Sequence, residues 1–195
     1  MSIEHMVKFF IGTDLSGTDI TRLTGRPPVL YSDLKNYKSI NQLLGKFKFV
    51  IILYQTSSIN NGHFVCLREN DDGQLSYSDS YGYHYDTEQS LGATFDTRFP
   101  KYLTMLIDKD GRDCVSNTYD YQRKSSQVAT CGRYSSVFAI WRNLSFSEIN
   151  DIFTQNSDAW LNGPDNLVVI LTMLSLGNIR EFYKGKSSFS LIPKN

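Results

Sequence analysis

A single cysteine stands between a small residue and a glycine in the segment QVATCGRYSSVFAIW, residues 127–141. The residues after Cys131 have the apolar spacing of a helix, with Val137, Phe138 and Trp141 on one stripe. If the helix begins near Cys131, its unpaired backbone N–H groups and its dipole favour the thiolate form. A thiol in this position can act as a nucleophile, although buried cysteines without a chemical role are also common.

A histidine and an aspartate lie on two candidate strands upstream of the thiol. The segments GHFVCLRE (62–69) and QLSYSDSYG (74–82) flank the turn signal NDDG, which predicts a β-hairpin. A turn centred near Asp71 pairs residues whose numbers sum to about 142, and this pairing places His63 opposite Asp79. Cross-strand neighbours have Cβ atoms about 5 Å apart, so the carboxylate can orient the imidazole. Together with the thiol, these side chains predict a nucleophile, a general base and an orienting acid.

Acyl transfer also needs hydrogen-bond donors for the developing oxyanion, and a glutamine upstream of the nucleophile can supply one. Two glutamines, Gln122 and Gln127, precede Cys131. Gln122 ends a predicted strand at 114–122, where its side chain can be held rigidly, whereas Gln127 lies in a polar loop four residues before the thiol. The sequence favours Gln122 and leaves Gln127 as the alternative.

Three more reactive side chains have simpler interpretations. His84 lies close to Asp79 in sequence and is a competing base, but Gly82 predicts a turn that carries it away. Arg133 follows the Cys-Gly pair, and it is either a solvated residue or a contact for a substrate carboxylate. Cys66 points to the opposite face of its strand from His63, which predicts a buried core position.

The bulk composition narrows the class of protein. Twenty basic and twenty acidic residues cancel, so no overall positive field supports nonspecific nucleic-acid binding. Three cysteines without a C-x-x-C pair fit neither a disulfide framework nor a structural zinc site, and they favour a reducing compartment. The longest apolar run, LVVILTML (167–174), is shorter than the roughly 18 residues that a membrane span needs. We therefore expect a soluble, intracellular protein without a membrane partner.

The chain has further segments with the pattern of a helix or a strand. They are a helix at 31–45, a strand at 47–55, helices at 99–111 and from about 132, a helix that begins at the Ser145/Glu148 capping box, and a helix at about 165–176. This order is a segregated α+β arrangement with a mixed or mostly antiparallel central sheet packed against helices. It predicts one domain at 1–185 and a flexible tail at 186–195.

The order His63, Asp79, Gln122 and Cys131, with GHFVCL, YSDSYG and TCGRY around these residues, resembles the adenain and SUMO-protease superfamily of cysteine proteases. The resemblance covers about residues 47–142 and is greatest to the adenain-like maturation proteases of viruses, including virophages and other viruses with double jelly-roll capsids. It implies a papain-like fold with the nucleophile at a helix N-terminus. It also implies Cys131 as nucleophile, His63 as base, Asp79 as its orienter and Gln122 as oxyanion donor.

The sequence departs from that superfamily at three places. Phe64 stands where a tryptophan often follows the histidine, and Ser135 and Ser136 stand where bulkier residues are common. The nine-residue step from Gln122 to Cys131 is longer than usual. This longer step is the reason that Gln127 stays open as the oxyanion donor.

The resemblance implies amide hydrolysis through a thioester, without a metal or an organic cofactor. The expected substrates are viral capsid or core precursors cut near small residues such as glycine, in the virus factory of the host cytoplasm and in the virion. DNA or a short peptide can stimulate such enzymes. Two alternatives are a protease that removes SUMO or another ubiquitin-like modifier, and a catalytically silent assembly module that kept the fold.

Overall fold

The computed structural model describes residues 3–56, 62–87, 98–157 and 163–175. A five-stranded sheet has the strand order β1-β2-β3-β4-β5, formed by Val29–Leu30, Phe49–Gln55, Gly62–Glu69, Leu75–Ser78 and Cys114–Ser116. Strands β2, β3 and β4 are antiparallel, whereas β1 is parallel to β2 and β5 is parallel to β4. The chain therefore has a mixed α+β fold, as predicted. The expected tail at 186–195 lies outside the described residues.

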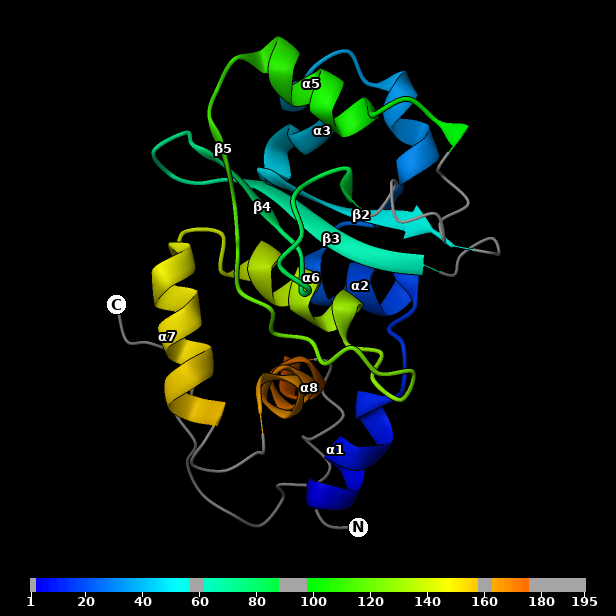
Figure 1. Cartoon of the computed structure of the whole chain (residues 1–195), viewed down its shortest axis with the longest axis vertical. Coiled ribbons are helices and arrows are strands. Elements are labelled where there is room, and N and C mark those ends of the chain that lie inside the picture. The colour runs from blue at the N-terminus through cyan, green and yellow to red at the C-terminus, as the bar shows by residue number, and fades with distance from the viewer. Residues whose placement is uncertain (1–2, 57–61, 88–97, 158–162, 176–195) are drawn as a thin grey trace.

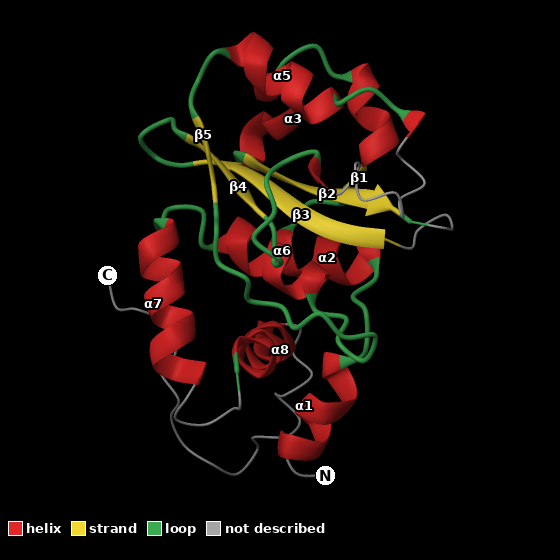
Figure 2. Ribbon diagram, viewed as in Figure 1, coloured by secondary structure: helices red, strands yellow, loops and turns green. Residues whose placement is uncertain are grey.

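Helices form layers on both faces of this sheet. They are α1 (Ile3–Ile11), α2 (Gly17–Thr24), α3 (Ile40–Leu44), α5 (Tyr102–Asp110), α6 (Cys131–Ile140), α7 (Phe146–Ser157) and α8 (Pro164–Ser175), with 3-10 helices η1 (Tyr31–Asn36) and η2 (Gly45–Phe47). Helices α3 and α5 cover one face, α2 and α6 cover the other, and α1, α7 and α8 lie beyond α6 (Figures 1 and 2). Across the described ranges, no helix is both long and apolar enough to cross a membrane.

Strand β2 is buried along its whole length, and its alternate side chains enter two apolar cores. Phe49, Ile51 and Leu53 belong to the core that includes the apolar residues of α6. Val50 and Ile52 belong to the core that includes α3 and α5. The strand predicted at 47–55 is therefore confirmed as a strand covered on both faces.

The prediction of one continuous helix at 31–45 is wrong, because this range contains two separate helices. The chain forms η1, becomes extended at Tyr37 and Ser39, and then begins α3. The Ser39 hydroxyl accepts a hydrogen bond from the backbone N–H of Gln42 at 3.2 Å, so this serine caps a new helix. Gly45 ends α3 with a φ of 56°, as its position predicted.

The predicted hairpin exists, but the predicted register is wrong. The Gly73 N–H donates to the Asn70 carbonyl, the Asn70 N–H donates to the Gln74 carbonyl, and Gly73 has a φ of 86°. This arrangement is a three-residue loop centred on Asp72, one residue later than expected. It pairs Cys66 with Ser78, so every cross-strand partner is shifted by two residues.

The strands predicted at 74–82 and 114–122 are both shorter than expected, because side chains and turns replace the ladder beyond Ser78. The Gly82 N–H donates to the Asp79 carbonyl at 3.0 Å, and Gly82 has a φ of 71°. The Gln122 N–H donates to the Ser80 carbonyl at 2.9 Å. The two segments therefore remain adjacent without continuing as strands.

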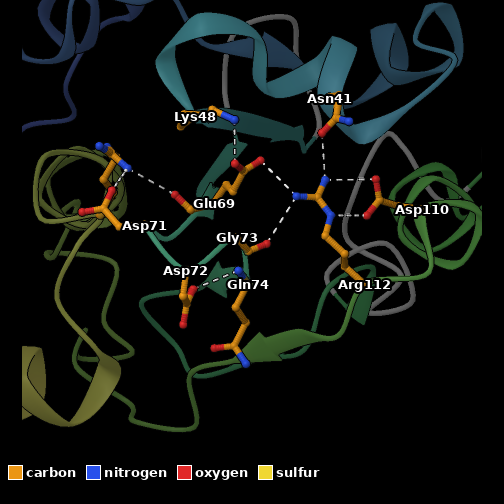
Figure 3. Close-up of polar contacts among 10 residues, drawn as sticks. Asn41, Lys48, Glu69, Asp71, Asp72, Gly73, Gln74, Asp110 and Arg112 are labelled. Atoms are coloured by element: carbon orange, nitrogen blue, oxygen red, sulfur yellow. Dashed lines mark hydrogen bonds and ion pairs between the residues drawn. The ribbon is translucent and has the colours of Figure 1, made fainter.

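Two buried or partly buried arginines fix the elements that carry the candidate site. Arg68 of β3 is fully buried and donates to the carbonyls of Trp141 and Leu144 at 2.7 and 2.9 Å, which holds the C-terminal end of α6 against β3. Arg112 contacts Glu69 and Asn41, and so ties the hairpin to α3, as Figure 3 shows. The Arg68 contacts position β3, which carries His63, relative to α6, which carries Cys131.

Candidate active site

The structure brings His63 and Asp79 together. The His63 Nε2 atom lies 3.1 Å from the Asp79 Oδ1 atom, and both side chains are buried. Asp79 is not directly opposite His63, because it follows β4 in a register shifted from the expected one. The contact is instead a diagonal one, which is within reach of long side chains.

Cys131 joins this pair from the other side. It is the first residue of α6, as predicted, and it is 6% exposed. Its thiol lies beside the His63 ring, close enough to raise the pKa of the imidazole. Because Asp79 occupies the Nε2 atom, Nδ1 is the ring nitrogen left for the thiol. The three residues expected to act as nucleophile, base and orienter are therefore in contact.

The environment of His63 favours its protonated form. Burial alone lowers the pKa of an imidazole, but the charge and hydrogen bond of Asp79 raise it, and the neighbouring Cys131 thiol raises it further. The net effect is a pKa of His63 well above its ordinary value of about 6.5. The imidazolium can therefore donate a proton to a leaving group at neutral pH.

Tyr81 packs against the histidine, a contact that sequence reasoning missed. Its ring stacks on the His63 ring with centroids 4.9 Å apart and an interplanar angle of 18°. Its backbone N–H donates to Asp79 Oδ1 at 2.7 Å. The correct hairpin register would have predicted this contact. In the observed register Cys66 pairs with Ser78, and the same pairing extended along the two segments places Tyr81 opposite His63.

Gln122, and not Gln127, lies beside this cluster. Gln122 is 3% exposed, and its Oε1 atom accepts a hydrogen bond from the Ser80 hydroxyl at 2.7 Å. Its Nε2 atom donates to the Tyr81 hydroxyl at 3.1 Å and to the Val128 carbonyl at 3.3 Å. Gln127 is exposed, and its backbone N–H contacts a serine of its own loop. A substrate oxygen must displace one of the two acceptors of Gln122 to receive its hydrogen bond.

Asn117 holds the backbone of the aspartate, a role that no pattern in the sequence indicated. Its Oδ1 atom accepts from the Asp79 N–H at 2.7 Å, and its Nδ2 group donates to the Asp79 carbonyl at 2.8 Å. Nδ2 also donates to the Tyr119 carbonyl at 3.1 Å. Asn117 is 1% exposed, so these bonds are shielded from water. The paired bonds fix Asp79 just after its strand ends.

Two glycines permit close approaches at the site. A Cβ atom at Gly62, directly before His63, would lie 1.8 Å from the Tyr54 carbonyl oxygen. A Cβ atom at Gly132, directly after Cys131, would lie 3.3 Å from the Phe64 ring and 3.4 Å from Leu15. A side chain at position 132 would therefore push the Phe64 ring away by a few tenths of an ångström, and glycine lets the helix that carries the thiol pack against β3 without this shift.

Other candidate residues lie elsewhere or have structural contacts. His84 is exposed and its ring lies 3.8 Å from the Tyr85 ring. Arg133 is neither solvated nor available to a substrate, because it is 2% exposed and donates to the Thr172 hydroxyl at 2.8 Å. Burial lowers the pKa of Arg133 to about 10. Cys66 is fully buried, as predicted.

We expect an alkylating reagent to distinguish the three cysteines. Burial raises the pKa of both Cys66 and Cys114 to about 12, so these thiols are almost entirely protonated at pH 7.5. Iodoacetamide should therefore modify Cys131 at least about tenfold faster than either of them, measured by peptide mapping with mass spectrometry. Faster labelling of Cys114 than of Cys131 would contradict the assignment of the nucleophile.

The site has the groups for thiol chemistry and not for metal binding. Among the residues that the structure describes, no group of three or more histidine, cysteine, aspartate or glutamate side chains could hold a metal ion. The polar groups that converge are a thiol, an imidazole, a carboxylate and a primary amide. This set can carry out nucleophilic attack and proton transfer at a carbonyl.

Comparisons with known proteins place the chain near a virophage protein. No model of a known protein family matches it. It is 24% identical over 173 residues to "Uncharacterized protein V9" of Sputnik virophage, covering 86% of this chain and 98% of that protein. It is also similar in structure to the central domain of the uncharacterized Lpg1148 protein from Legionella pneumophila, with a TM-score of 0.45 and 11% identity over 86% of this chain and 98% of that chain. The structural likeness is too distant to carry an argument, whereas the sequence match indicates that the chain is related to a virophage protein.

Proposed function

We propose that the protein is a cysteine endopeptidase of the adenain and SUMO-protease type, with a papain-like arrangement of its catalytic elements. The observation that carries this proposal is the contact of His63 with both Asp79 and Cys131 at the N-terminus of α6. A thiol and an imidazole at a helix N-terminus, with a carboxylate on the second ring nitrogen, is the arrangement that activates a nucleophile for acyl transfer.

The proposed reaction has two halves. The Cys131 sulfur bonds to the scissile carbonyl carbon, and the oxyanion receives hydrogen bonds from the backbone N–H of Cys131 and from Gln122. His63 gives its proton to the leaving amine, the C–N bond breaks, and a thioester remains. A water molecule then attacks the thioester while His63 takes a proton from it. The acid product leaves, and the thiol is restored.

We propose viral capsid or core precursors as the substrates, cut near small residues. The relationship to a Sputnik virophage protein supports a viral context. The proposed setting is the virus factory of the host cytoplasm and the virion. Stimulation by DNA or by a short peptide belongs to the same proposal, and activity unchanged by added DNA at low salt would argue against the DNA part.

One experiment tests both the activity and the substrate class. The purified protein and its Cys131→Ala variant are incubated with three kinds of substrate. These are co-encoded capsid proteins, glycine-rich peptides, and a reporter in which a ubiquitin-like modifier is joined to a second group through its C-terminal diglycine. Masses are read by mass spectrometry. We expect the parent protein to cut a capsid protein at a defined site and the variant to cut nothing. Cleavage of the diglycine reporter alone would favour a deconjugating protease.

A catalytically silent module is the second candidate, and two observations favour it. Cys131 is only 6% exposed, and both amide hydrogens of Gln122 point to acceptors inside the protein. If the parent protein cuts none of these substrates, with and without DNA, and iodoacetamide does not distinguish Cys131 from Cys66, the silent module is the better account.

A further inference from the structure

One buried side chain from α8 holds both ends of the long segment between Gln122 and Cys131. Asp165 lies in the first turn of α8 and is 2% exposed. It contacts the residue after Gln122 and the residue before Cys131. These positions are adjacent in sequence to the proposed oxyanion donor and the proposed nucleophile.

One carboxylate oxygen of Asp165 holds the nucleophile end. Asp165 Oδ1 accepts a hydrogen bond from the Thr130 hydroxyl at 2.6 Å and a longer one from the Tyr134 hydroxyl at 3.4 Å. Thr130 is fully buried, and its carbonyl accepts from the N–H groups of Arg133 and Tyr134. Because the Thr130 hydroxyl bonds to Asp165, it does not cap its own helix. The start of α6 is thus fixed by α8.

The second carboxylate oxygen holds the glutamine end. Asp165 Oδ2 accepts from the backbone N–H of Arg123 and from its Nε atom, both at 3.1 Å. The Tyr134 hydroxyl adds a hydrogen bond to the Tyr121 carbonyl at 3.2 Å, directly before Gln122. Both ends of the 123–130 segment are therefore tied to the same carboxylate.

A role confined to α8 does not account for these contacts. An acidic residue in the first turn of a helix stabilises its own helix through the dipole and the free N–H groups. Asp165, however, accepts hydrogen bonds from Thr130, Tyr134 and Arg123, which all lie outside α8. A charge as deeply buried as this one is costly unless its hydrogen bonds are made.

We propose that Asp165 is a positioning residue that sets the distance between Gln122 and Cys131. The inference rests on the proposed function, because it assigns the two ends of the segment to the oxyanion donor and the nucleophile. A single carboxylate is suited to this task, since its two oxygens accept separately from the two ends. The long step between the glutamine and the cysteine then needs no regular secondary structure to keep its geometry.

The test replaces Asp165 with asparagine, which has almost the same shape but only one acceptor oxygen. The amide oxygen can accept from only one end of the segment, and the amide nitrogen can meet the Thr130 hydroxyl only by donating to it. The charge-assisted hydrogen bonds to one end are therefore lost, and that end is held less tightly. We expect kcat for a cleaved peptide to fall about 10- to 100-fold while KM changes less than about threefold. We also expect hydrogen exchange at the amides of 123–130 to become at least about tenfold faster, with exchange in β2 and β3 unchanged.

Asp86→Asn is the matched control. Asp86 is also 2% exposed and accepts from the Tyr54 and Thr104 hydroxyls at 2.9 and 2.7 Å, on the opposite face of the sheet. Its loss should cost comparable stability while leaving exchange at 123–130 unchanged. Arg123→Ala, which removes only the Nε contact, should reduce kcat less than Asp165→Asn.

The outcomes separate this inference from the proposed function. If Asp165→Asn loosens 123–130 but kcat is unchanged, or if exchange accelerates throughout the chain, the positioning role is wrong. If the parent protein does not cut any substrate, the proposed function fails, and hydrogen exchange still decides whether Asp165 holds the segment. Unchanged exchange at 123–130 would overturn the inference in either case.

Discussion

The His63→Ala variant is expected to lose about 10⁴-fold or more in kcat/KM for a cleaved peptide, as much as Cys131→Ala. The thiol and the imidazole act as one unit, because the ring takes and returns the protons of the reaction. The double variant should therefore be no slower than either single variant. Initial rates on a fluorogenic peptide with the cleavage sequence would measure all three.

His84→Ala is the control for this prediction. His84 is exposed and its ring contacts Tyr85. Its removal should change kcat/KM by less than about twofold, because surface substitutions away from a site have small effects. An active His63→Ala variant beside an inactive His84→Ala variant would show that the wrong histidine has been assigned as the base.

The Asp79→Asn variant is expected to lose about 10²- to 10⁴-fold in kcat at pH 7. The carboxylate orients the imidazole, and its charge is a main cause of the raised pKa of His63. Without that charge, burial lowers the pKa, so the imidazole is neutral at pH 7 and cannot protonate the leaving amine. Cleavage rates measured from pH 5 to pH 9 should show the activity of the variant shifted to lower pH.

The same pair predicts a pH dependence of stability. The pKa of His63 is raised in the folded protein above the unfolded value of about 6.5, so the resulting stability is fully present below pH 6.5. It is lost as the pH rises through the folded pKa, with a slope of at most about 1.4 kcal/mol per pH unit.

Urea unfolding of the parent protein and of Asp79→Asn, from pH 6 to pH 9.5, tests this dependence. The difference in unfolding free energy between the two proteins should shrink as the pH rises. Ionisation of Cys66 and Cys114 in the unfolded chain affects both proteins equally, so it cancels in the difference. A difference that is constant across this range would mean that Asp79 does not raise the pKa of His63.

Local patterns in the sequence were sufficient to predict several elements. The unbroken apolar run at 47–55 predicted a strand covered on both faces, and 62–69 is the strand that carries His63. The Ser145 and Glu148 side chains form the reciprocal bonds of a capping box at α7, as their spacing predicted. Each of these features depends on residues within a few positions of one another.

The sequence also predicted that a thiol, an imidazole and a carboxylate would meet, although it predicted the wrong hairpin register. The predicted contact between His63 and Asp79 still forms, because the two side chains are long enough to meet diagonally across the strands. A three-residue loop with Gly73 at positive φ shifted the pairing by two residues. The choice between turn types depends on a balance of small backbone energies, which NDDG alone does not settle.

The sequence alone determined the chemical groups of the site and the elements that carry most of them. Only the tertiary structure decided how those groups are held. Asn117 contacts Asp79 across 38 positions, Asp165 contacts Thr130 across 35, and Arg133 contacts Thr172 across 39. A buried polar side chain needs a hydrogen-bond partner, because an unpaired buried polar group is costly. Its partner is whichever donor or acceptor the packing of the two cores brings next to it. No periodic pattern in the sequence predicts contacts between residues this far apart. The residues that position the site could therefore be identified only in the folded molecule.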